Sequence, residues 1–165
     1  MEQQTVGVIR QARAEDAGRC GEVARIAWQR VFDAWLELMG PELFVQHHTG
    51  WEERHSGACA QAVREHPERA VVTEVDGHIV GFLTWYFPGP EGVGEIGANA
   101  VHPDWQGRGI GVRQCRHALD LFRQMSLTSA TVYTGLDEGH APARTMYVKA
   151  GFDCATPHIR YYTKL

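Results

Sequence analysis

The sequence contains no uninterrupted apolar stretch long enough to cross a lipid bilayer. It has no internal repeat, no low-complexity tract and no linker-like segment, so a single domain over residues 1–165 is expected. The N-terminal segment from Met1 to Gln4 lacks the basic and apolar regions of a secretory signal. We therefore expect a cytoplasmic protein without a membrane partner.

Cysteine is scarce, and no two cysteines form a C-x-x-C pair. The chain has 4 of them, which are Cys20, Cys59, Cys115 and Cys154. Their wide spacing excludes a zinc ribbon and a thioredoxin-like redox site. It predicts reduced thiols that serve as small apolar side chains.

Potential metal ligands gather only around residues 47–59, where His47, His48 and His55 precede Cys59. Two glycines within residues 50–57 argue against one straight helix that would align these side chains. The spacing also matches no common zinc pattern. The sequence therefore predicts no metal site.

An excess of basic residues is absent as well. The chain has 16 basic and 20 acidic residues, a formal net charge of −4 at pH 7. This balance argues against nucleic acid as a partner, and it permits a cationic acceptor such as an amine. A hydrophobic content of 44% and a charged content of 22% are ordinary for a globular domain.

Hydrophobic periodicity predicts a mixture of helices and strands. The predicted helices cover residues 16–39, 112–125 and 141–150, with one or two further pieces over 41–65. The predicted strands cover residues 6–10, 70–75, 78–87, 94–101 and 130–134, with a closing strand over 160–164 paired with a short one over 152–155. Asp76-Gly77 is a strong hairpin signal, and Gly81 predicts a bulge or a close backbone approach. This order predicts an α/β (α+β) fold around a mixed sheet.

The run from Gln106 to Gly111, Gln-Gly-Arg-Gly-Ile-Gly, lies between a predicted strand and a predicted helix. Backbone N–H groups in the first turn of a helix have no partner inside the helix, and the helix dipole adds partial positive charge. Such a turn can bind phosphate. A side chain at Gly109 or Gly111 would hold a ligand away from the backbone.

Two common phosphate-binding motifs do not fit this run. A P-loop would end in Gly-Lys-Ser/Thr, whereas Val112 and Arg113 follow Gly111. A dinucleotide fingerprint needs the spacing G-x-G-x-x-G, whereas the glycines here occupy every second position. Both of those ligand classes are therefore excluded.

The spacing Gln-x-x-Gly-x-Gly, preceded by Ala100 to Trp105, resembles the pyrophosphate loop of the GNAT superfamily of acyl-CoA-dependent N-acetyltransferases. A second segment, Ala143 to Phe152, is similar to the last helix of that family, which ends in Tyr-x-Lys-x-Gly-Phe. The resemblance is clear over residues 69–152 and weak before residue 65. It implies a GNAT-like, mostly antiparallel sheet of about six to seven strands with about four helices, in which the fourth and fifth strands splay apart around acyl-CoA.

The resemblance also implies a function and a set of site residues. The implied reaction transfers an acetyl group from acetyl-CoA to a primary amine of a small molecule, by direct attack in a ternary complex. The backbone of Asn99, Ala100 and Val101 should pair with the pantetheine arm, and Tyr147 should donate a proton or a hydrogen bond to the departing sulfur. The implied pyrophosphate-binding residues are Gln106, Gly107, Arg108, Gly109, Ile110, Gly111 and Val112, with Arg108 adding charge. A homodimer is compatible with the resemblance, because dimers are frequent among similar proteins.

Two polar residues carry less specific expectations. His140 occupies a position where many family members have asparagine, and it is either a cofactor-binding residue or a solvated loop histidine. Strand alternation predicts Glu95, Gly97 and Asn99 on one face, which makes Glu95 the first choice for the general base. A chain of waters, or an exposed glutamate without a catalytic role, is the alternative.

Trp28, Phe32 and Trp35 follow one face of the first long helix. Core packing explains this spacing. In similar proteins, however, this helix lines the acceptor cleft. The candidate aromatic acceptor pocket, with cation–π contact to an amine, therefore consists of Trp28, Phe32, Trp35 and Trp85.

Two other functions remain open at this stage. One is acetylation of a protein N-terminus or lysine, which an acidic groove open at both ends would favour. The other is a CoA-binding sensor without turnover, against which an intact loop together with Tyr147 argues.

Overall fold

The computed structural model describes residues 7–165. Its helices are α1 (Ala17–His48), α2 (Trp51–Glu65), α3 (Ile110–Gln124) and α4 (Ala141–Ala150). Its strands are β1 (Val8–Gln11), β2 (Ala70–Val75), β3 (His78–Tyr86), β4 (Val93–Val101) and β5 (Ser129–Val132). The first predicted strand is present, although Val6 lies outside the described residues. No helix within residues 7–165 is long and apolar enough to span a membrane.

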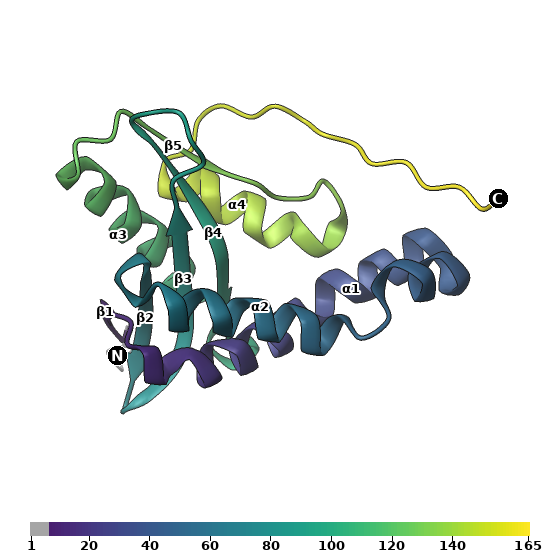
Figure 1. Cartoon of the computed structure of the whole chain (residues 1–165), viewed down its shortest axis with the longest axis horizontal. Coiled ribbons are helices and arrows are strands. Elements are labelled where there is room, and N and C mark those ends of the chain that lie inside the picture. Colours follow the sequence, from purple (N-terminus) through teal and green to yellow (C-terminus); the bar gives the residue numbers. More distant parts are fainter. Residues whose placement is uncertain (1–6) are drawn as a thin grey trace.

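The strands form one sheet in the order β1-β2-β3-β4-β5. All neighbours are antiparallel except β4 and β5, which are parallel. Helices α1 and α2 cover one face of the sheet, and α3 lies across the other (Figure 1), where α4 packs beside it. The predicted mixed α/β class is confirmed.

Strands β2 and β3 are buried along almost their whole length because helices cover both faces of the sheet. On the α1–α2 face, Val72 and Phe82 pack with Val63 of α2. On the α3 face, Leu83 packs with Cys115. The sheet is therefore a rigid support for the loops at its ends.

The predicted break after the first helix is a kink. Gly40 has a φ of 73°, outside the helical region, and Pro41 follows it inside α1. Proline lacks the N–H that would continue the helical ladder, and glycine tolerates the positive φ. α1 therefore continues to His48 in a new direction.

The predicted closing strand is wrong, and so is the total of six to seven strands. Residues 152–165 contain no strand, and β5 is the last strand of the sheet. This segment runs as an extended chain away from the sheet (Figure 1) toward the far half of α1. There the Tyr162 ring lies 5.0 Å from that of His47, and Lys164 pairs with Glu42. Contacts with α1 thus replace the strand pairing expected from the sequence.

Gly81 was predicted to mark a bulge or a close backbone approach, and the structure shows both. The β2–β3 register shifts between Thr73 and Glu74, which places a bulge beside Gly81. A Cβ at Gly81 would lie 3.0 Å from the carbonyl oxygen of Ala100 and 2.9 Å from Nε2 of Gln114. The Cβ-less backbone at this position lets β3, β4 and α3 pack closely.

A second bulge lies in β4. Leu83 pairs with Asn99 and Trp85 pairs with Ile96, so Thr84 alone opposes Gly97 and Ala98. The Thr84 hydroxyl accepts a hydrogen bond from the Ala98 N–H at 3.0 Å and holds this irregularity in place. The extra residue reverses the alternation of side chains beyond it.

One ion pair ties β1 to the start of α1. The Arg10 guanidinium donates to both carboxylate oxygens of Asp16, at 2.7 and 3.1 Å, and Asp16 is 8% exposed. This hydrogen bonding lowers the pKa of Asp16 despite the opposing effect of burial. The pair therefore stabilises the fold above the unfolded-state pKa of about 3.9, and this contribution is lost as pH falls through the lower folded-state pKa.

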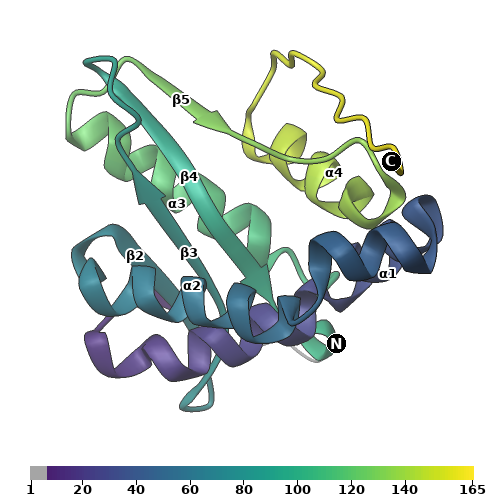
Figure 2. The same cartoon turned by 45° about the vertical axis from the view of Figure 1, so that its right-hand side comes forward.

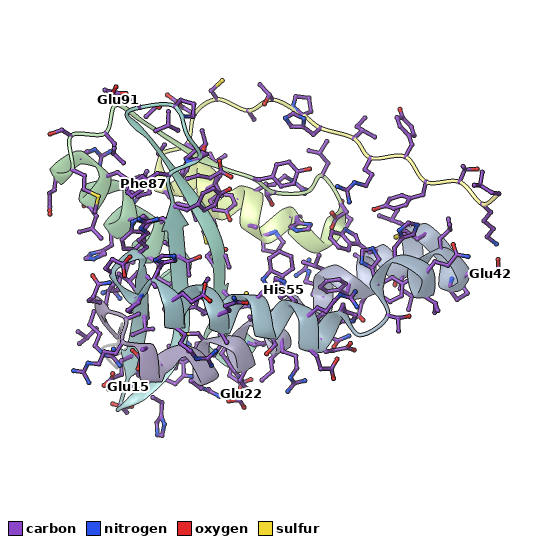
Figure 3. The ribbon with its side chains drawn as sticks, in the orientation of Figure 1. Glu15, Glu22, Glu42, His55, Phe87 and Glu91 are labelled. Carbon is purple, nitrogen blue, oxygen red and sulfur yellow. The ribbon has the colours of Figure 1, made fainter. Side chains whose placement is uncertain are left out.

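We predict that Asp16→Asn lowers the free energy of unfolding at pH 7 by about 1–3 kcal/mol, because it removes a nearly buried charge-assisted pair and leaves Arg10 with Glu74 as its carboxylate partner. The loss of stability on acidification should also be shallower than in the wild type. Urea unfolding at several pH values measures both effects. The control is Glu22→Gln, which removes an exposed pair with Arg19 (Figure 3) and should change little.

Candidate active site

A cleft of about 1490 Å³ opens where β4 and β5 separate. The two strands pair only as far as Ile96 and Val132, and beyond that point they diverge (Figure 2). The cleft is lined by β4, the 106–112 loop, α4 and the middle of α1. The splay implied by the resemblance is present.

The 106–112 loop begins α3 in the expected manner. Gly107 and Gly109 have φ values of 76° and 77°, which favour glycine, and a Cβ at either would meet no atom within 4 Å. The first helical hydrogen bond runs from the Arg113 N–H to the Gly109 carbonyl at 3.1 Å. Within residues 7–165, the N–H groups from Gly107 to Val112 have no hydrogen-bond acceptor. These free donors, which adjoin the cleft, make the loop a suitable anion site.

Gln106 and Arg108 support the loop in different ways. The Gln106 side chain donates to the Val101 carbonyl at 2.8 Å and ties the loop to the end of β4. The Arg108 guanidinium lies 4.5 Å from the Trp105 ring and donates to the Asp104 carbonyl. Arg108 thus lies against Trp105 and does not line the cleft. The other residues predicted to bind the pyrophosphate do line it.

Asn99 and Tyr147 meet in the cleft between β4 and α4. The Tyr147 hydroxyl donates to Oδ1 of Asn99 at 3.3 Å, and the Asn99 amide lies 3.8 Å from Sγ of Cys115. Burial raises the pKa of Tyr147 well above its ordinary value, with a further contribution from Cys115, and the hydrogen bond to Asn99 offsets this only in part. The phenol therefore keeps its proton over the physiological range and can donate it.

Glu95 lines the same cleft but not on the same face as Asn99. Its Oε1 accepts a hydrogen bond from the Tyr86 hydroxyl, and its Oε2 accepts one from the Thr131 hydroxyl at 3.0 Å. The hydrogen bond to Glu95 raises the pKa of Tyr86 to about 12. The prediction that Glu95, Gly97 and Asn99 share a face is wrong, because the β4 bulge turns Asn99 toward α3.

His140 ends the 3₁₀ turn Glu138–His140 and leads into α4. Its Nδ1 lies 2.8 Å from Oδ2 of Asp137, and its backbone N–H donates to Oδ1 of the same carboxylate at 3.1 Å. The Trp35 indole also donates to Oδ2, at 3.1 Å. Burial acts to raise the pKa of Asp137, but the hydrogen bonds from Trp35 and His140 outweigh it and hold that pKa below its ordinary value.

The four predicted aromatic acceptor residues do not form one pocket. Trp28 lines the cleft and lies 4.2 Å from the ring of His55. Phe32 is buried against Trp51, with ring centroids 3.9 Å apart, and Trp35 holds Asp137. Trp85 is buried against Phe122 on the α3 side of the sheet. The structure therefore brings only Trp28 of the four to the cleft surface.

His55 projects from the side of α2 nearest α4 (Figure 3). Its Nε2 lies 3.8 Å from Sγ of Cys59, and burial lowers its pKa to about 4. His55 is thus neutral at pH 7 and belongs to the aromatic cluster around Trp28. No group of three or more His, Cys, Asp or Glu side chains in the described part of the chain is arranged to hold a metal ion.

Comparison with known proteins accounts for this combination of loop, splayed strands and tyrosine. The sequence model of the acetyltransferase (GNAT) family matches residues 28–152. The chain belongs to the GNAT acetyltransferase family. The match includes β4, the 106–112 loop and α4, which line the cleft.

One curated relative and two solved structures illustrate the range of this GNAT chain's similarities. Mycothiol acetyltransferase of Stackebrandtia nassauensis is 30% identical over 121 residues, which cover 70% of this chain and 39% of that protein. The chain thus spans about two fifths of the length of that relative.

PaiA N-acetyltransferase from Thermoplasma acidophilum, solved in complex with coenzyme A, superimposes with a TM-score of 0.68 at 17% identity and covers 88% of this chain and 89% of that one. Ard1 from Thermoplasma volcanium gives a TM-score of 0.63 at 22% identity, covering 92% and 85%. Both structures share the GNAT fold of this chain.

Sequence reasoning missed Asp137 in this GNAT chain. An aspartate three residues before a histidine, at the start of a helix, is a local capping signal that could have been read. Its bond to Trp35 spans more than a hundred residues and leaves no sequence signature. The same holds for the hydroxyls of Tyr86 and Thr131 that engage Glu95.

Proposed function

We propose that this protein is an N-acetyltransferase that transfers the acetyl group of acetyl-CoA to a primary amine of a small molecule, by direct attack in a ternary complex. The observation that carries the proposal is the continuous cleft that joins the unpaired N–H groups of residues 107–112 to the Asn99–Tyr147 pair. One end of the cleft can bind the diphosphate of acyl-CoA, and the other end offers a proton donor for its reacting thioester.

The residues present fit acetyl-CoA, which supplies an activated thioester when bound. The backbone N–H groups from Gly107 to Val112 would hold the diphosphate, because they are free and the helix dipole of α3 adds to their positive potential. The β4 backbone from Asn99 to Val101 lines the cleft beyond the last pairing with β5, so it is available to the pantetheine arm. Arg108 would act through loop support rather than through direct charge, given its contact with Trp105.

Tyr147 would protonate the sulfur as it leaves, since its phenol is kept protonated by burial. The hydrogen bond to Asn99 positions the Tyr147 oxygen, and the hydroxyl would turn from Asn99 to the sulfur when the thioester is bound. Glu95 stays a predicted base: it lines the cleft, and both of its oxygens accept hydroxyl hydrogen bonds.

The acceptor end of the cleft supports a cationic or aromatic amine. Among the residues that line the cleft, Trp28 and Tyr133 supply aromatic surface, and Asp33, Glu37 and Glu138 supply negative charge. Carboxylates and aromatic faces attract an ammonium group before it loses its proton. A small molecule can use all these groups at once.

Titration calorimetry with coenzyme A, followed by a screen of primary amines with acetyl-CoA, tests the proposal. We expect saturable binding of coenzyme A, and release of free thiol that depends on at least one small amine. Turnover with peptides only would instead assign a protein N-terminal or lysine acetyltransferase. Binding without turnover would assign a CoA-binding sensor, and no binding would end the proposal altogether.

The remaining expectations stay predictions. They are one acetyltransferase domain over residues 1–165, a cytoplasmic location and a homodimer. Size-exclusion chromatography with light scattering tests the last of them.

A further inference from the structure

The Asp137–His140 pair is a closely organised polar group at the wall of the cleft, which His140 lines. Both residues have side chains that are only 10% exposed. Asp137 accepts hydrogen bonds from the Trp35 indole, the His140 ring and the His140 backbone. A carboxylate bound by three donors cannot turn, so it fixes the His140 ring in one orientation.

This arrangement also fixes the tautomer of His140. The carboxylate oxygen is an acceptor only, so the 2.8 Å contact requires the proton to lie on Nδ1. In the neutral ring the lone pair then lies on Nε2. His140 lines the cleft, and its Nε2 has no protein partner within residues 7–165. The nitrogen that can accept a proton is therefore the one left to the cleft.

His140 is also well placed relative to Tyr147. His140 is the N-cap residue of α4, and Tyr147 lies seven positions later, which is about two helical turns. The two residues therefore lie on the same side of the helix, about 10 Å apart along its axis. Tyr147 lies at the cofactor end, and His140 lies beside Trp28 of α1, with ring centroids 5.6 Å apart, at the acceptor end. A base at one end and an acid at the other suit a reaction in which nitrogen loses a proton and sulfur gains one.

The charged and titratable groups around His140 come from several elements. Arg144 of α4 donates to the Asp137 carbonyl at 2.7 Å, and Arg30 of α1 lies 3.5 Å from the Glu138 carbonyl. The neighbouring aromatic cluster includes His48, against Trp35, and His55, against Trp28. Asp33, Glu37 and Glu138 line the open cleft nearby. Of these groups, Asp137 alone hydrogen-bonds to the His140 ring.

We propose that His140 is the catalytic base of the transfer reaction and that Asp137 is its positioning residue. The inference rests on the proposed function. The amine nitrogen bonds to the thioester carbon, the carbon–sulfur bond breaks, and the nitrogen's proton passes to Nε2 of His140, directly or through one water. The sulfur takes the Tyr147 proton, and the proton on His140 returns to the Tyr147 oxygen through water in the cleft. The products are an amide and a free thiol.

The experiment measures kcat/KM for the amine against pH, together with acetyl-CoA affinity by calorimetry. The variants are His140→Ala, His140→Gln and Asp137→Asn. Glutamine keeps a polar side chain of similar length while lacking a titrating nitrogen. We expect at least a tenfold loss of kcat/KM in both His140 variants, loss of the acidic limb of the profile, and acetyl-CoA Kd within about twofold of the wild type. Asp137→Asn should lower kcat/KM while the acetyl-CoA Kd stays within about twofold, because an amide no longer holds the proton on Nδ1 of His140.

Two matched variants complete the experiment. His66→Gln removes an exposed histidine outside the cleft and should leave the profile unchanged. Glu95 is the alternative base, and Glu95→Gln tests it directly. Loss of the acidic limb in Glu95→Gln, with retention of the limb in the His140 variants, would make Glu95 the base and overturn the proposal. A rise in acetyl-CoA Kd equal to the loss of rate would make His140 a cofactor-binding residue and overturn the proposal. A wild type that binds coenzyme A but acetylates no amine refutes the proposed function itself, which separates the two failures.

Discussion

Gly109→Val should weaken coenzyme A binding about 1000-fold, which corresponds to about 4.1 kcal/mol. The substituted residue would need a φ of 77°, which a β-branched side chain rarely adopts, so the loop should shift. A shifted loop would no longer hold its free N–H groups in their present arrangement. Titration calorimetry measures the loss directly.

A matched variant separates this effect from general backbone strain. Gly77 lies in the β2–β3 turn with a φ of 78° and open space around its Cβ position, and it does not line the cleft. Gly77→Val should therefore carry a similar strain of about 1–3 kcal/mol without weakening cofactor binding. Tight coenzyme A binding by Gly109→Val would show that the phosphates lie elsewhere.

Tyr147→Phe should lower kcat about 100-fold while the acetyl-CoA Kd changes less than about twofold. Phenylalanine keeps the packing against Phe152 and removes only the hydroxyl that donates to Asn99. Loss of a positioned proton donor typically costs a factor of 10²–10⁴. Stopped-flow or steady-state thiol release measures kcat, and calorimetry measures Kd.

The control for this substitution is Tyr161→Phe, because Tyr161 is 88% exposed in the C-terminal segment. It removes the same atom far from any hydrogen-bond network and should leave kcat unchanged. Equal turnover of the wild type and Tyr147→Phe would exclude Tyr147 from the chemistry. A leaving thiolate that needs no proton in the rate-limiting step would then explain the result.

Local signals were the ones that sequence reasoning read correctly. The Asp76-Gly77 hairpin, the Gly40-Pro41 break, the bulge at Gly81 and the glycine-rich start of α3 all depend on residues a few positions apart. Each needs a backbone geometry that glycine or proline makes easy or impossible. Such features can be predicted without knowing the tertiary structure.

The errors came from features that depend on distant partners. The alternation from Glu95 to Asn99 failed because Thr84, on the neighbouring strand, binds the backbone of Ala98 and stabilises a bulge. The closing strand failed because the C-terminal segment contacts α1 instead of the sheet. Trp85 was misplaced because the face of β3 that it occupies is set by the packing of α3. None of these partners can be read from local periodicity.

The β4 bulge opposite Thr84 places the Glu95 carboxylate and the Asn99 amide on opposite faces of one strand, although both residues line the same cleft. A regular strand of the present length, without the bulge, would turn Asn99 to the face of Glu95 and away from Tyr147, although no functional side chain would be removed. Deleting Gly97 or Ala98 would remove the bulge but keep Asn99 opposite Leu83. The number of residues between Ile96 and Asn99 matters to the site only together with the backbone pairing that accommodates them.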